Sequence, residues 1–113
     1  MNDQGDRYLT GSYSSKDRAY FRNARLDYVE ALPANPDASI LELGCGNGAT
    51  GVAAQRAGKC GRYVGIEMFE PEALQAAKVL TKVHIGNVET LELPYEEATF
   101  DALIMSEDRK SVV

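Results

Sequence analysis

The chain has 113 residues, of which 44% are hydrophobic and 26% charged, a composition typical of one small globular domain. Asp and Glu outnumber Lys and Arg by 17 to 12, which gives a net charge of −5. This balance argues against a nucleic-acid-binding domain that relies on a basic surface, although it does not exclude an enzyme that acts on a nucleotide.

Nothing in the sequence predicts a membrane span or secretion. No run approaches the roughly 20 apolar residues that a transmembrane helix needs, and residues 1–11 lack the apolar core of a signal peptide. Cys45 and Cys60 form neither a CxxC pair nor a disulfide framework, and His84 has no partner at metal-ligand spacing. We therefore expect a cytoplasmic protein with two free thiols, no metal site and no membrane partner. The sequence does not predict the oligomeric state.

The first third of the chain predicts a polar segment and one helix. Residues 1–15 are polar, and we expect them to be poorly ordered at their start. Over residues 17–32, apolar side chains recur at spacings of three and four, at Phe21, Ala24, Tyr28 and Leu32. Pro33 and Pro36 end this predicted helix and favour an extended connection.

Strands and helices then alternate along the chain. Apolar runs predict strands at Ser39–Leu43, 63–67, Lys82–Ile85 and Ala102–Met105, and helical patterns occupy residues 50–57 and 70–78. Such alternation is typical of βαβ units, and near-continuous apolar strands are typical of a sheet covered on both faces. The sequence therefore predicts an α/β fold, a Rossmann-like doubly wound sheet with about four parallel strands.

A glycine-rich turn is the main candidate for a ligand-binding site. Gly44, Gly46 and Gly48 lie between the first predicted strand and the following helix, where a backbone without Cβ atoms can turn tightly and approach a ligand. Glu67 ends the second predicted strand, 21 positions after Gly46 (67 − 46). A carboxylate at that place can accept the hydroxyl hydrogens of a ribose. Together the turn and the carboxylate indicate an adenosine-containing cofactor.

The residues alone leave the identity of that cofactor open. Gly44, Gly46 and Ala49 also fit the dinucleotide fingerprint, so an NAD-dependent oxidoreductase is one alternative. A non-catalytic nucleotide-binding module is another. Glu42, two residues before the first glycine, favours a methyl donor, because its carboxylate suits an amino group and repels a pyrophosphate.

The later part of the chain points to one family. Residues 40–48, ILELGCGNG, resemble the first motif of class I S-adenosylmethionine-dependent methyltransferases. Residues 64–67, 86–94 and 100–106 are similar to the second, third and fourth motifs of that family, in the same order. The resemblance covers about residues 39–106 and implies S-adenosylmethionine as the cofactor.

The resemblance implies a role for each matched position. Glu42 and residues 44–46 would surround the methionine end of the cofactor, and Glu67 would hold the ribose. The residues implied for cofactor binding are Glu42, Gly44, Cys45, Gly46, Glu67, Met68, Asn87, Val88 and Ser106. Among them, Met68 would pack on the adenine, Asn87 and Val88 would border its edge, and Ser106 would lie near the sulfonium.

Several features stay unassigned or depart from the pattern. Asn87 stands where the family usually has aspartate, so we expect an altered contact with the adenine amino group. We name no catalytic residue, because a sulfonium methyl is already activated and needs mainly proximity and orientation. The sequence does not identify the methyl acceptor.

The resemblance also predicts an incomplete domain. In this family further strands follow the fourth, so we expect residues 16–107 to form a partial methyltransferase domain. Residues 108–113 correspond to the codons of a common sequencing adapter, and our hypothesis is that they are not native. We expect such a chain to bind S-adenosylmethionine weakly and to transfer no methyl group.

Overall fold

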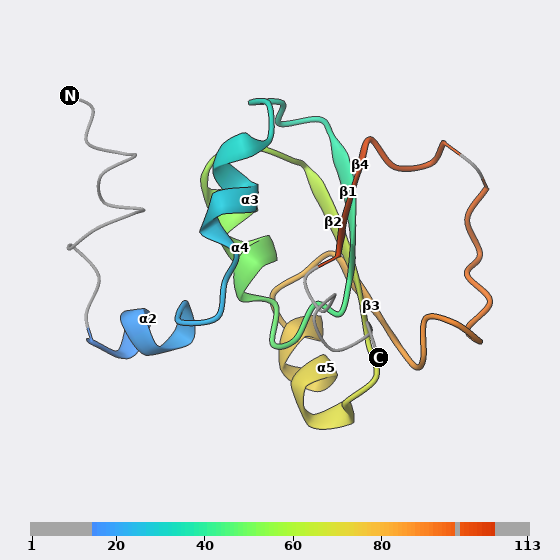
Figure 1. The fold of residues 1–113 in the computed structure, drawn as a ribbon. Coiled ribbons are helices and arrows are strands. Elements are labelled where there is room, and N and C mark those ends of the chain that lie inside the picture. The colour runs from blue at the N-terminus through green and yellow to red at the C-terminus, as the bar shows by residue number, and fades with distance from the viewer. Residues whose placement is uncertain (1–14, 97, 106–113) are drawn as a thin grey trace.

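A sheet of four parallel strands lies at the centre of the molecule (Figure 1). The computed structural model describes residues 15–96 and 98–105. The strands are β1 (Ser39–Leu43), β2 (Arg62–Glu67), β3 (Lys82–Ile85) and β4 (Ala102–Met105), in the order β3-β2-β1-β4. In this register Leu41 pairs with Val64 of β2 and with Leu103 of β4. The strand order therefore reverses at β1, because the chain moves outward to β3 and then returns to the other side of β1.

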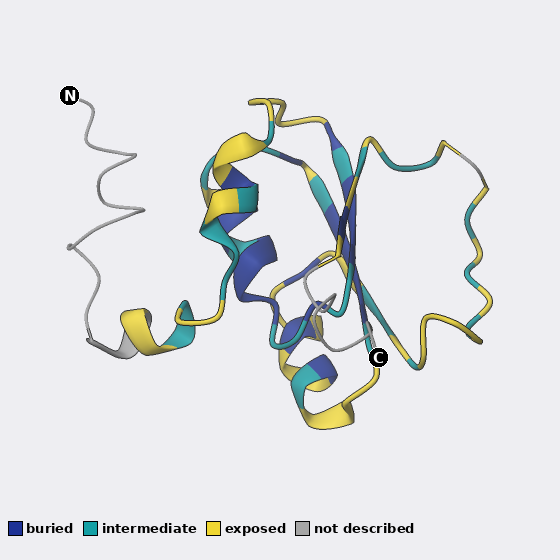
Figure 2. Cartoon of the chain, in the orientation of Figure 1, coloured by how far each residue is buried: buried dark blue, intermediate teal, exposed yellow. Residues whose placement is uncertain are grey.

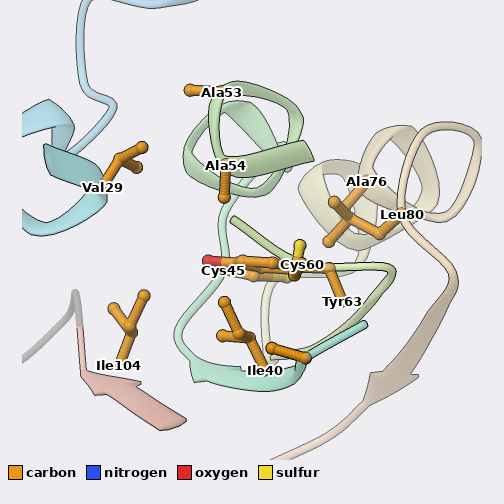
Figure 3. Packing of buried hydrophobic residues seen from close by; sticks show 11 residues of the cluster. Val29, Ile40, Cys45, Ala53, Ala54, Cys60, Tyr63, Ala76, Leu80 and Ile104 are labelled. Carbon is orange, nitrogen blue, oxygen red and sulfur yellow. The ribbon is translucent and has the colours of Figure 1, made fainter. Parts of the chain in front are cut away.

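Helices cover one face of this sheet. These helices are α3 (Leu26–Ala31), α4 (Ala49–Arg56) and α5 (Glu70–Ala77), whereas the short helix α2 (Ser15–Tyr20) lies away from the sheet (Figure 1). Figure 3 shows the small side chains of Ala54 and Ala76, from α4 and α5, above Ile40 of β1. Alanines at these positions let the helices approach the sheet closely, and Figure 2 shows that the buried residues gather where helices and strands face each other.

The connection between β3 and β4, residues 86–101, crosses the opposite face. Because parallel crossovers are right-handed, a connection that reverses direction across the sheet must pass over the other side. This segment leaves β3 and returns to β4 on the side away from the helices (Figure 1). Its side chains Leu91, Leu93, Tyr95 and Phe100 pack on the cluster Leu41, Val64 and Ile66. Both faces of the central strands are thus covered.

The single helix predicted over residues 17–32 is wrong: the structure has two helices, α2 and α3, separated by a turn. Arg25 leaves the helical region, with φ −92° and ψ 75°. Its amide donates a 2.9 Å hydrogen bond to Oγ1 of Thr50 in α4. Apolar residues recur at helical spacing on both sides of this break. The reason is that they all pack against one core: Phe21, Leu26, Tyr28 and Leu32.

The remaining elements confirm the predicted fold. Three strands have the predicted bounds, and β2 begins one residue early at Arg62. The helix after β1 begins and ends one residue earlier than predicted, and the helix after β2 ends one residue earlier. The α/β, Rossmann-like class with four parallel strands is confirmed. None of the helices among the described residues is long and apolar enough to cross a membrane. Most of the polar segment 1–15 and the whole of 108–113 lie outside the described residues.

Candidate functional site

The glycine-rich loop follows β1 at the carboxyl end of the sheet, where the strand order reverses. In sheets of this kind ligands bind at that place. The amides of Gly44 and Cys45 donate to the carbonyl of Ile66 at 2.8 and 3.0 Å, which ties the start of the loop to β2. Gly46 and Gly48 have φ values of 58° and 94°, a region that residues with a Cβ rarely adopt.

Gly48 also meets a steric requirement. A Cβ on Gly48 would lie 3.0 Å from Cγ2 of Val79 and 3.2 Å from Cα of Ala76, so the loop and α5 can pack closely only without it. Asn47 Oδ1 accepts the amide of Ala49, the first residue of α4, at 3.1 Å. The loop is therefore fixed at both ends, by β2 and by α4.

Glu67 reaches from the end of β2 to the middle of this loop. Its Oε1 accepts the amide of Gly46 at 2.8 Å, and its Oε2 accepts the amide of Phe69 at 3.1 Å. The structure thus brings together two residues that the sequence placed at one site. Each carboxylate oxygen has two lone pairs, so these bonds leave Glu67 able to accept further donors, such as ribose hydroxyls.

Glu42 lies on the helix-covered face of β1 and is 1% exposed. Its Oε1 accepts a 2.6 Å hydrogen bond from the hydroxyl of Tyr63 in β2. Sequence reasoning singled out Glu42 and missed Tyr63, because a tyrosine in an apolar strand gives no sign of its partner. Glu42 precedes Gly44, the first residue of the glycine loop, by two positions and pairs with Gly65 of β2, next to which the Cys45 thiol lies.

Cys45 marks an acidic environment in the loop. Its side chain is buried, and its Sγ lies 2.5 Å from where a Cβ on Gly65 would stand, so the thiol fills space that β2 leaves open. Burial, and then the negative charges of Glu42, Glu67 and Glu72, raise the pKa of this thiol. Glu67 and Glu72 both reach Gly46, and Glu42 pairs with Gly65, next to which the Cys45 thiol lies, so the loop has an acidic surrounding. Cys45 acts as a packing residue here, as expected of a buried free thiol.

Glu72 and Tyr20 were not predicted as site residues. Glu72 comes from the first turn of α5, and its Oε1 lies 3.4 Å from the position of a Cβ on Gly46. The hydroxyl of Tyr20 in α2 lies 3.4 Å from the carbonyl oxygen of Asn47 in the loop. Neither residue belongs to a motif, and only the packing of α5 and α2 brings them to the loop.

The residues expected around an adenine follow β2 and β3. Met68 is 67% exposed and Val88 is 43% exposed, so both offer apolar surface. Asn87 Oδ1 accepts the amide of Glu89 at 2.8 Å, within a turn that leads away from β3. The role of Asn87 in adenine binding stays a prediction, beside its visible role in this turn. Ser106 lies outside the described residues.

Comparison with known proteins identifies the family. A family model described as a methyltransferase domain matches residues 40–111, and this match covers the loop, β2, β3 and β4. The chain belongs to the class I S-adenosylmethionine-dependent methyltransferase family. Nocamycin O-methyltransferase from Saccharothrix syringae is 31% identical over 81 residues, which are 71% of this chain and 29% of that protein.

Solved structures of other methyltransferases have the same fold. The Haloferax volcanii complex that contains the Trm112 methyltransferase activator matches 80% of this chain with a TM-score of 0.64 and 15% identity, over 42% of that chain. Geranyl diphosphate C-methyltransferase from Streptomyces coelicolor A3(2), in complex with S-adenosyl-L-homocysteine, matches 86% of this chain with a TM-score of 0.57 and 22% identity, over 41% of that chain. This methyltransferase chain thus spans 29–42% of the lengths of these relatives.

Proposed function

We propose that this chain binds S-adenosylmethionine at the glycine-rich loop and that the protein transfers the methyl group to an acceptor. The observation that carries the proposal is the acidic surrounding of the loop, where Glu67 and Glu72 reach Gly46 and Glu42 lies on β1 two residues before Gly44. S-adenosylmethionine carries a sulfonium and an ammonium against one carboxylate, a net charge of about +1, whereas NAD carries two pyrophosphate charges against one nicotinamide cation, a net charge of about −1. Three carboxylates outweigh the roughly half positive charge at the start of α4, so the site favours the cationic ligand.

The described residues fit that ligand in specific ways. Glu67 retains lone pairs for the ribose hydroxyls, and its bond to the Gly46 amide positions it against the loop. Met68 and Val88 offer exposed apolar surface for the adenine. We assign Glu42 to the ammonium of the methionine moiety, because it comes two residues before the loop and its carboxylate is screened from water, where charge pairing is strong.

The reaction requires little acid–base catalysis from these residues. The bound sulfonium supplies an activated methyl group, and the residues named above would hold and orient it. Because the chain spans 29–42% of the lengths of the relatives named above, we assign acceptor binding to residues outside those described. We expect the 113-residue chain alone to bind the cofactor weakly and to show no turnover.

Calorimetric titration and thermal shift of the 113-residue chain with three ligands test the proposal. S-adenosylmethionine should bind and raise Tm, S-adenosylhomocysteine should bind more weakly because it lacks the sulfonium charge, and NAD should not bind. In a Glu72→Gln variant the ratio of the affinity for S-adenosylmethionine to that for S-adenosylhomocysteine should be smaller, because one carboxylate is removed. Binding of NAD in place of S-adenosylmethionine would instead support an oxidoreductase, and turnover by the chain alone would contradict the assignment of the acceptor site.

A further inference from the structure

Tyr63 lies at the centre of the helix-covered face and makes one contact that packing alone does not require. Its side chain is fully buried, and its hydroxyl donates to Glu42 at 2.6 Å. The two residues are diagonal neighbours on adjacent strands, because Tyr63 pairs with Ile40 and Glu42 pairs with Gly65. A phenylalanine would fill the same core volume, so the hydroxyl serves the carboxylate.

The tyrosine ring is held in place from several directions. Its backbone amide donates to Oγ1 of Thr81 at 2.9 Å, and its carbonyl accepts the amide of Thr81 at 3.0 Å. On the helix side, a Cβ on Gly51 would lie 2.6 Å from Cδ1 of the ring, so α4 packs directly on it. Figure 3 shows Tyr63 lying between the sheet and the two helices, with Leu80 beside it. The direction of its hydroxyl is therefore fixed before any ligand binds.

We infer that Tyr63 is a positioning residue that keeps Glu42 ionised and aimed at the cofactor's ammonium. This inference rests on the proposed function. A carboxylate removed from water is costly to ionise unless donors compensate, and a phenol O–H bonded to it favours the charged form. Beside Glu42, the flanking strand residues Gly65 and Ile104 carry no charge, and Cys45 is a neutral thiol. Across the loop, Glu67 and Glu72 add negative charge that opposes ionisation, and the Tyr63 hydroxyl is a donor that compensates for it.

A double-mutant cycle with Tyr63→Phe and Glu42→Gln tests this role. Removing the hydroxyl alone should weaken S-adenosylmethionine binding about 10-fold at neutral pH, since a hydrogen bond to a charged group is lost. The pH below which binding weakens should also move upward in Tyr63→Phe, because Glu42 then protonates more readily. In the Glu42→Gln background the same change should have less than about a 2-fold effect. Tyr95→Phe is the matched control, because it removes a hydroxyl bonded to His84 on the opposite face and should leave binding unchanged.

The outcomes separate this inference from the proposed function. Equal loss from Tyr63→Phe in both backgrounds, or an unshifted pH profile, overturns the positioning role while the proposed function stands. If the wild-type chain binds no S-adenosylmethionine, the proposed function fails. The infrared difference spectrum between wild type and Glu42→Gln then still shows whether the Glu42 carboxyl is ionised. That spectrum also serves if Tyr63→Phe does not fold. Ionised Glu42 at neutral pH supports the inference, and a protonated-acid carbonyl band overturns it.

Discussion

The carboxylate of Glu67 and the backbone amide of Gly46 are joined by a 2.8 Å hydrogen bond across 21 residues of sequence. The bond links the end of β2 to the middle of the glycine-rich loop after β1. A residue proposed to hold the ribose therefore also fixes the loop that borders the ligand. Loop order and cofactor binding should for this reason depend on the same side chain.

Replacing Glu67 with alanine should weaken S-adenosylmethionine binding by about 10- to 100-fold, which corresponds to losing about 1.5–3 kcal/mol from a hydrogen-bonded charge. Exchange of the Gly46 amide with solvent should become faster, because its acceptor is gone. Calorimetry measures the first effect and hydrogen-exchange mass spectrometry or NMR the second. Glu70→Ala is the matched control, since Glu70 is an exposed glutamate three residues away in the first turn of α5. Equal losses in the two variants would show that only net charge matters.

Much of the fold was predictable because local pattern and tertiary packing agree. The apolar run of β1 is buried or half-buried at the centre of the sheet, the runs of β3 and β4 form its edge strands with Ile85 and Leu103 exposed, and the glycine turn follows β1 as predicted. The predicted helix over residues 17–32 failed because Thr50, 25 positions further on, binds the amide of Arg25. A contact of that range leaves no trace in the periodicity of the segment.

A methyl group added at Gly51 should destabilise the chain although alanine favours helices. The new Cβ would stand 2.6 Å from the Tyr63 ring and would also overlap Leu80. Overpacking of this kind costs about 1–3 kcal/mol, against a gain of about 1 kcal/mol in helix propensity. Gly51→Ala should therefore lower Tm and also weaken S-adenosylmethionine binding through Tyr63.

Gly58→Ala provides the comparison for that variant. Nothing lies within 4 Å of a Cβ at Gly58, but its φ of 72° strains an alanine, so stability should fall by about 1–2 kcal/mol. Binding should stay unchanged, because Gly58 is away from the tyrosine and the loop. A Gly51→Ala chain with a raised Tm would contradict the close packing of α4 on β2.

The candidate site was predictable only in part. Residues in the loop and at the strand ends were identified, because a glycine turn and a spaced carboxylate are sequence signals. Tyr63 and Glu72 were missed, since the first depends on strand register and the second on how α5 packs against the loop. Both contact residues far away in sequence, and neither stands at a position that a motif marks.

Alkaline pH should destabilise the chain through Cys45. Burial, and then the nearby carboxylates, raise the pKa of this thiol above its ordinary value of 9.0. The folded state thus keeps a proton that the unfolded state loses, so stability is full below about pH 9 and falls as pH rises above it, by up to about 1.4 kcal/mol per pH unit. Urea unfolding between about pH 8 and about pH 10 measures the slope, which Cys45→Ala should flatten. Cys60→Ala should flatten it less, and equal slopes in all three chains would disprove the assignment.

The pKa of His84 reports on the packing of the opposite face of the sheet. It can be measured without ambiguity, because His84 is the single histidine of the sequence. Burial, and then the positive charge of Lys82, lower its pKa below 6.5. The fold therefore favours the neutral ring: the stability that it contributes is present above about pH 6.5 and is lost as pH falls through the lowered pKa. An NMR titration of its ring signal should give a midpoint below 6.5, and Lys82→Gln should move that midpoint upward without restoring it fully, since burial remains. A midpoint at or above 6.5 in the wild-type chain would mean that residues 86–101 do not cover His84 as the packing beside Tyr95 requires.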